Sequence, residues 1–268
     1  MTLEARRQHM TADTQQDLGD IAGTIEILRN RLRAVPGDQR ARMFLFQILC
    51  VEGAWEKARA QLKMLAELSP DARMLSLAYN QAIDGEVARR DACGGGASAP
   101  LLRASPGWVS DLADAFAADA HSAAAMRARA FDASPDAPGD VDGRPFDYMF
   151  DGDGRFGPAF EAIIAGRWGL MPFCVVEQIK SEGPVDLRDT VWLPVEIRLR
   201  DGGAVAALLP ARYPDTELQD DLALRLGRRT DWHGTDPVRG LGQRVWTTST
   251  GEDIGILSFR TIRFTSLS

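Results

Sequence analysis

The sequence predicts an α+β protein in which a stack of paired helices is followed by a smaller, mainly β domain. Two observations favour this order. Up to about residue 136, apolar residues recur every three or four positions, which is typical of amphipathic helices. Beyond that point, short runs of β-branched and aromatic residues alternate with Gly, Pro and Asp, which favours strands and tight turns. The 268 residues, 45% of them hydrophobic, suffice for two modest domains.

Four amphipathic helices are expected before residue 91. A first apolar stripe ends at Pro36, and a second spans about residues 40 to 52. A third runs from Trp55 to Leu68, and a fourth covers about residues 72 to 90. Proline ends a helix because it has no amide hydrogen and its ring clashes with the preceding turn. The stops between the stripes therefore indicate separate helices joined by short turns.

The spacing of these helices indicates a repeat. Gly19 and Gly53 are 34 residues apart, and so are Pro36 and Pro70. That is the period of the tetratricopeptide repeat, in which each helix pair stacks on the next. Ala58 supplies the small residue needed where two helices cross. We therefore expect a short tetratricopeptide-like stack with a concave face.

A further trace of the repeat follows out of phase, with a glycine-rich insertion before it. The trace covers residues 118–135, and the insertion, DACGGGASAP, covers residues 91–100. From these patterns we predict a disordered tail at residues 1-16, a tetratricopeptide-like helical domain at 17-136 and an α+β domain at 137-268.

The α+β domain is expected to contain β-hairpins. Residues 190–214 form two apolar runs joined by Asp-Gly-Gly at 201–203, which is a strong hairpin signal. Residues 243–264 predict a second hairpin that turns near Gly251. Residues 167–182 favour one strand, bent at a proline, and residues 215–229 favour an amphipathic helix.

Composition excludes several classes of protein. The net charge of −7 and the pI near 5.1 disfavour binding to nucleic acid, which usually needs a basic face. The longest apolar run, around residues 43–51, is far too short to span a bilayer, and the first residues lack the apolar core of a signal peptide. Cys50, Cys93 and Cys174 match no disulfide framework or zinc motif. We expect a cytoplasmic protein without membrane insertion.

The stretch DGDGRFGPAFEAI, which begins at Asp151, resembles the start of a calcium loop. Such a loop needs oxygen ligands at positions 1, 3 and 5, glycine at position 6 and glutamate at position 12. Asp153 fits position 3, but Arg155 stands at position 5, Phe156 at position 6 and Ala162 at position 12. A turn leading into the second domain is the favoured interpretation. Arg155 would then pair with one of the aspartates or face a partner.

One enzymatic alternative stays open, a metal-dependent hydrolase. Its ligands would be Asp151, Asp153, Glu161 and, as a further candidate, His233. His233 stands between Asp231 and Asp236, but a lone histidine in a polar loop is more often solvated. The sequence contains no G-x-S-x-G elbow and no phosphate-binding loop. We therefore assign no catalytic, cofactor-binding or metal-binding residue.

Aromatic residues and arginines in the second half are candidates for a partner interface, because Trp, Tyr and Arg dominate binding energy at interfaces. The candidate partner-binding residues are Arg155, Arg188, Trp192, Arg212, Tyr213 and Trp232. The competing interpretation is that most of the tryptophans, including Trp168 and Trp246, pack in the core.

Several long stretches carry a family resemblance that covers residues 17–262. They are FLFQILCVEGAWEKARAQLKMLAELSP, VDGRPFDYMFDGDGRFGPAFEAIIAGRW, MPFCVVEQI, DLRDTVWLPVEI, LLPARYPDT, LRLGRRTDW and GLGQRVWTTSTGE. In this order they resemble the ImpE family, also called SciE-type or TagJ-type, of accessory proteins in bacterial type VI secretion.

The resemblance implies a role without enzymatic activity. It implies a tetratricopeptide-like domain followed by an α+β domain peculiar to the family, with no catalytic residue and no cofactor. It also implies a cytoplasmic adaptor that binds the N-terminal helix of the small contractile-sheath subunit. Through that contact the adaptor would link the sheath to the AAA+ ATPase that disassembles it.

Overall fold

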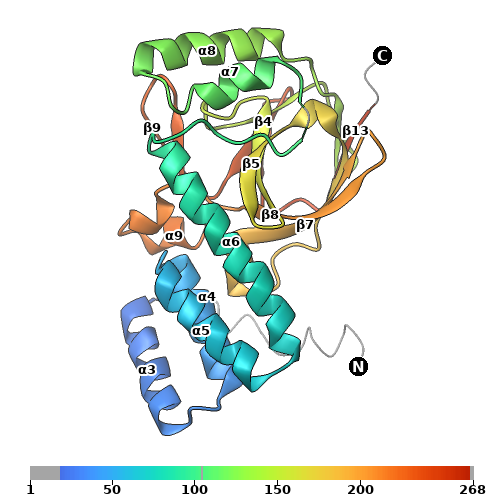
Figure 1. The fold of residues 1–268 in the computed structure, drawn as a ribbon. Coiled ribbons are helices and arrows are strands. Elements are labelled where there is room, and N and C mark those ends of the chain that lie inside the picture. Colours follow the sequence, from blue (N-terminus) through green and yellow to red (C-terminus); the bar gives the residue numbers. More distant parts are fainter. Residues whose placement is uncertain (1–18, 104, 266–268) are drawn as a thin grey trace.

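Helices and strands occupy different halves of the chain. The computed structural model describes residues 19–103 and 105–265, so the tail predicted at residues 1-16 lies outside the described residues. Six helices, α3 to α8, lie within residues 21–133, and thirteen strands lie within residues 139–264 (Figure 1). The prediction of a helical first half and a mainly β second half is confirmed. No helix among the described residues is long and apolar enough to cross a membrane.

The helices of the predicted repeat form a stack of antiparallel neighbours. They are α3 (Ile21–Ala34), α4 (Gln39–Val51), α5 (Trp55–Leu68) and α6 (Asp71–Cys93), and consecutive helices pack against each other. Asp38 begins α4, because its carboxylate accepts a hydrogen bond of 2.9 Å from the amide of Ala41.

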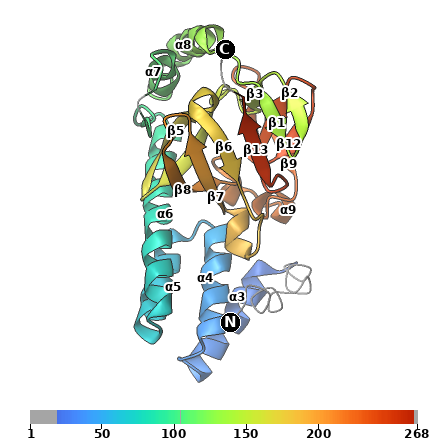
Figure 2. The ribbon, with the colours of Figure 1, turned by 90° about the vertical axis from the view of Figure 1, so that its right-hand side faces the viewer.

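Helix α6 links the two ends of the molecule. It extends three residues further than predicted, into the glycine-rich stretch, and ends where Gly95 takes a left-handed conformation with φ of 85°. It runs along one side of the sheet, with α3 to α5 near its start (Figures 1 and 2). Beyond its far end lie α7 (Trp108–Asp114) and α8 (Ala120–Ala133).

The second half is built on an eight-stranded antiparallel sheet with the order β2-β1-β13-β6-β7-β8-β4-β5. In that order the strands are Arg144–Phe146, Gly139–Val141, Thr261–Phe264, Val176–Lys180, Trp192–Leu199, Ala204–Pro210, Ala159–Ile164 and Arg167–Pro172. A three-stranded sheet joins β12 (Asp253–Gly255), β11 (Val245–Thr248) and β3 (Met149–Asp151). A two-stranded sheet joins β10 (Arg239–Gly242) and β9 (Thr230–His233).

Both predicted hairpins exist, and two other predicted elements were wrong. β7 and β8 form the first hairpin, and β11 and β12 the second. The single strand predicted over 167–182 is two strands, because the 3-10 turn η1 (Phe173–Val175) separates β5 from β6. The helix predicted over 215–229 is only η3 (Thr216–Leu218) and the one-turn α9 (Leu222–Arg225).

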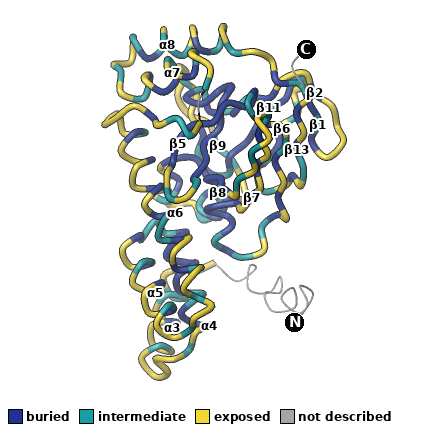
Figure 3. The backbone as a smooth tube through the Cα atoms, turned by 45° about the vertical axis from the view of Figure 1, so that its right-hand side comes forward, coloured by how far each residue is buried: buried dark blue, intermediate teal, exposed yellow. Residues whose placement is uncertain are grey.

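Two hydrophobic cores lie on opposite faces of the sheet. One lies within the second half and includes Phe160 and Trp246. The other joins the helices to the sheet and includes Ile83 of α6 with Ile163 and Trp168. Side chains alternate along β4, so the strand contributes to both cores and is buried almost throughout. Figure 3 shows buried backbone concentrated among the strands and exposed backbone along the helices at the periphery. The helices and the sheet thus share a core, and a domain boundary at residues 136–137 stays a prediction.

Candidate functional site

The aspartates of the stretch that begins at Asp151 are buried where α6 meets the sheet. Asp151 and Asp153 are 4% and 0% exposed. Arg155 forms a two-point ion pair with Asp153, with distances of 2.9 Å from Nε to Oδ1 and 2.6 Å from Nη2 to Oδ2. The amide of Gly240 donates a further hydrogen bond of 3.0 Å to Asp153. Of the two alternatives for Arg155, the structure therefore shows pairing with an aspartate.

Arg244 joins the other two carboxylates proposed as metal ligands. Its Nη1 donates to Asp151 and its Nη2 to Glu161, and all three side chains are fully buried. The guanidinium lies between the rings of Phe156 and Tyr213, 4.7 and 4.8 Å from their centroids. The residues that suggested a metal site thus surround an arginine.

Helix α6 contributes its own charges to this cluster. Arg89 donates two hydrogen bonds to the carboxylate of Glu161, of 2.7 Å from Nε and 2.9 Å from Nη2. Its Nη1 donates a third, of 3.2 Å, to the carboxylate of Glu86. The indole of Trp168 donates to Glu161 at 2.8 Å, and that of Trp192 donates to Glu86 at 3.0 Å. We call the five charged residues the junction network: Glu86, Arg89, Asp151, Glu161 and Arg244. It connects α6 to β3, β4 and the residue before β11.

Burial and pairing set the protonation of these groups. Burial raises the pKa of Asp151 above its ordinary value, against the opposing effect of Arg244. Burial acts in the same direction on Asp153, but the hydrogen bonds and charge of Arg155 outweigh it and hold the pKa of Asp153 below its ordinary value. Burial also raises the pKa of Tyr213, whose hydroxyl lies 3.2 Å from Asp151. The arrangement is that of a structural ion network.

The described residues offer no metal site for the alternative of a metal-dependent hydrolase. In residues 19–103 and 105–265, no group of three or more His, Cys, Asp or Glu side chains is placed to hold a metal ion. His233 is exposed on β9. Its neighbours in sequence are engaged by arginines: Asp231 lies 2.7 Å from Arg229, and Asp236 lies 3.4 Å from Arg127.

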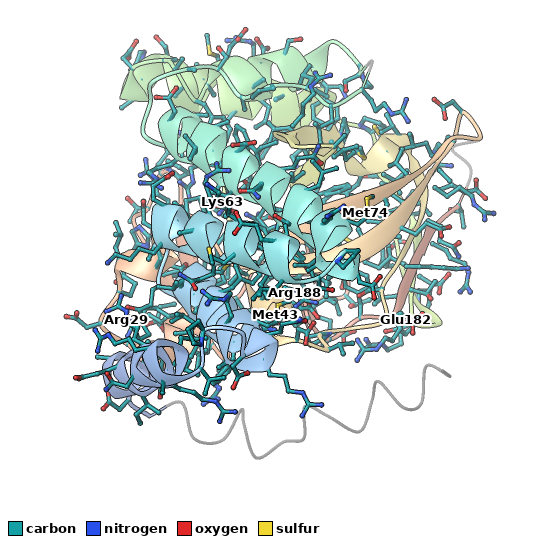
Figure 4. The ribbon with its side chains drawn as sticks, turned by 60° about the horizontal axis from the view of Figure 1, so that its bottom comes forward. Arg29, Met43, Lys63, Met74, Glu182 and Arg188 are labelled. Atoms are coloured by element: carbon teal, nitrogen blue, oxygen red, sulfur yellow. The ribbon has the colours of Figure 1, made fainter. Side chains whose placement is uncertain are left out.

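Two candidate partner-binding arginines face the helices instead of solvent. Arg188 lies in η2 (Leu187–Thr190), where its Nε donates to the hydroxyl of Tyr79 at 2.7 Å and its Nη1 approaches the sulfur of Met43 at 3.7 Å. Figure 4 shows Arg188 and Met43 close together under the helical stack. Arg212 donates to the carbonyl oxygen of Val51 at 3.0 Å and so satisfies the last turn of α4.

Exposure divides the remaining candidates. Trp192 and Tyr213 are fully buried, and Arg155 is 8% exposed. Trp232 is 43% exposed, although its ring also packs on that of Tyr213. Partner binding by these residues stays a prediction, but the chain itself already occupies most of their side chains. Only Trp232 presents a substantial part of its surface to solvent.

Glu86, Arg89 and Arg244 were not among the residues predicted from the sequence. Ala82, Glu86 and Arg89 follow at spacings of four and three, so the two charges continue the buried face of α6. A charged residue on an apolar stripe is a usable signal, because buried charges need partners. Arg244 gives no such local signal.

Comparison with known proteins agrees with this architecture. The family model for the tetratricopeptide repeat matches residues 16–78, and the model for the ImpE protein matches residues 143–263. The chain is 39% identical over 247 residues to the type VI secretion system accessory component TagJ of Pseudomonas aeruginosa, covering 91% of this chain and 87% of that protein. A crystal structure of a Vibrio parahaemolyticus protein shares the fold, with a TM-score of 0.82 at 21% identity, covering 95% of this chain and 97% of that one.

These findings fix the family. The repeat and the ImpE match fall on the two halves that the structure joins, in the same order. The relative from Pseudomonas aeruginosa spans nearly the whole chain at an identity that leaves no doubt of common descent. The chain belongs to the ImpE family of type VI secretion accessory proteins.

Proposed function

We propose that this protein is a non-enzymatic, cytoplasmic adaptor of type VI secretion. It binds the N-terminal helix of the small contractile-sheath subunit and links the sheath to the AAA+ ATPase that disassembles it. Its relative in Pseudomonas aeruginosa is named as an accessory component of this system. The absence of a catalytic role is supported by Asp151, Asp153 and Glu161, whose carboxylates bind arginines of the same chain.

The observation that carries the proposal is the attachment of the helical stack to the second half through buried hydrogen bonds and ion pairs. Besides the junction network, η2 lies against α4: the amide of Leu187 donates to the side chain of Gln47 at 3.0 Å, and Arg188 reaches Tyr79 of α6. The side of the stack formed by α4 and α6 is therefore occupied by the chain itself. A stack held in this way presents the surfaces of α3 and α5 to a partner as a fixed platform.

Calorimetry with the full chain tests the proposal. The titrants are the small contractile-sheath subunit of the same secretion system and a variant of that subunit without its N-terminal helix. We expect a complex of micromolar or tighter affinity that is lost with the helix, and recovery of the ATPase in a pull-down. Binding to neither the subunit nor the ATPase would overturn the adaptor role. Stoichiometric metal in the purified protein, found by elemental analysis, would contradict the absence of enzymatic chemistry.

A further inference from the structure

A groove between α3 and α5, with α4 as its floor, concentrates positive charge. Arg29 and Arg33 line it from α3, Arg42 from α4 and Lys57 from α5, and none of the described residues of its lining is a carboxylate. The chain as a whole has the opposite balance, with 38 acidic and 31 basic residues. Figure 4 views this end of the molecule, with Arg29 at its edge. An anionic ligand therefore meets four cations here, and no described carboxylate in the lining competes for them.

The cations of the groove lack acidic partners within the described chain. Arg29 and Lys57 are exposed and form no ion pair with another described residue. Arg42 is only 8% exposed, yet it bonds to neutral oxygens alone: the side chain of Gln61 at 3.0 Å and the carbonyl of Pro36 at 2.7 Å. Its buried Nε has no partner. A buried guanidinium without a counter-charge is costly, which favours an anion from outside the chain.

The floor of the groove is apolar. Leu45 and Leu49 of α4 are each 3% exposed, and Leu32 of α3 lines the same groove. The walls are helices whose backbone groups are bonded internally, so a partner cannot add as a strand and must be recognised by its side chains. Cations beside an apolar floor match a helix with one apolar and one acidic face.

We propose that this groove binds an acidic amphipathic helix of a partner protein. The apolar face of that helix packs on the partly buried Leu32 above the floor, and its carboxylates reach Arg29, Arg42 and Lys57. If the partner is the sheath subunit, the groove is where its N-terminal helix docks, and this part of the proposal rests on the proposed function. The positive charge of the groove favours it as the docking surface over the apolar surface around Met74 and Leu77 of α6. Those two residues are 72% and 53% exposed.

A designed helical peptide with leucine on one face and glutamate on the opposite face tests the groove independently of the sheath. In fluorescence anisotropy with the full chain, we expect the peptide to bind and to weaken with salt. Arg29→Glu/Lys57→Glu should reduce its affinity about tenfold. The matched control Arg73→Glu/Lys180→Glu makes the same charge change at exposed positions outside the groove. It should leave the affinity for the peptide unchanged. Equal weakening by the control, or equal binding of a peptide with lysine in place of glutamate, would overturn the proposal.

The sheath subunit separates the two proposals. If it binds the parent chain and the Arg29→Glu/Lys57→Glu variant equally well, the groove is not the docking site and the adaptor role stands. If the acidic peptide binds in the groove while neither the subunit nor the ATPase binds the chain, the groove stands and the proposed function falls. Loss of both in this variant, with thermal unfolding unchanged, supports both.

Discussion

Arg244 is the residue that turns a candidate metal site into a structural one. It forms ion pairs with both Asp151 and Glu161 in the interior, and its side chain carries no exposed surface. We expect Arg244→Met to lower the free energy of unfolding by about 3–5 kcal/mol, because two carboxylates lose their shared buried partner. Urea denaturation followed by tryptophan fluorescence measures this change.

Arg263→Met provides the control for that measurement. Arg263 pairs with Asp140 at 3.5 Å, and its side chain is 56% exposed. Exposed pairs contribute little to stability, so this variant should unfold like the parent. Equal losses in the two variants would show that Arg244 is not part of a buried network.

Asp153 predicts a loss of stability in acid. Its pKa in the folded state lies below the ordinary value, so the ionised form favours folding. That stabilisation is fully present above the ordinary pKa of about 3.9 and is lost as the pH falls through the lower folded value. Urea denaturation at pH values from roughly 2 to 6 should show this decline.

Asp153→Asn isolates the contribution of this residue to the acid-induced loss. The variant is less stable at neutral pH, since Arg155 loses its charged partner, but its free energy of unfolding should depend less on pH below about 4. Asp231→Asn, at a side chain that is 47% exposed, should keep the slope of the parent. An unchanged slope in Asp153→Asn would refute the assignment.

Sequence distance decides which contacts of this site were predictable. Arg155 and Asp153 are two positions apart, so their pairing follows from a local turn. Arg244 is 93 positions from Asp151 and 83 from Glu161, and only the fold brings these three together. The burial of Trp192 and Tyr213 shows the same limit, because an aromatic interface residue and an aromatic core residue are alike in sequence.

Among the elements, α6 packs tightly on the sheet at Gly85. A Cβ atom added at Gly85 would lie 2.9–3.0 Å from three atoms of Ile163 on β4. We therefore expect Gly85→Leu to lower the free energy of unfolding by about 1–3 kcal/mol through overpacking. Leucine favours a helix more than glycine does, but this gain is smaller than the cost of overpacking. Ala88→Leu, at an exposed position of the same helix, should change little. Thermal unfolding compares them, and equal melting temperatures would contradict this packing.

Local punctuation explains which elements the sequence predicts well. The helices of the repeat end close to Pro36 and Pro70, and the β7–β8 hairpin turns where Asp-Gly-Gly stands. The helix predicted over 215–229 failed because Gln219 and Asp221 adopt extended backbone conformations, with ψ of 143° and 113°, and these separate η3 from α9. Apolar periodicity alone cannot reveal such interruptions.

At the scale of the whole molecule, the two halves form a single framework. They share a hydrophobic core, the junction network crosses between them, and Arg212 closes the end of α4. No local pattern predicts this union, because each half carries its own periodicity and the contacts span the whole chain. The consequence for binding is that residues near the junction hold the chain together, while α3 and α5 keep accessible surface.

Hydrogen–deuterium exchange of the full chain with the small sheath subunit tests the central claim most directly. We predict slower exchange in α3 (Ile21–Ala34) and α5 (Trp55–Leu68) on complex formation, because the partner helix covers the groove between them. Residues 151–161 and 187–213 should exchange as in the free protein. Protection confined to residues 187–213, with α3 and α5 unchanged, would contradict the account and return the binding site to the junction.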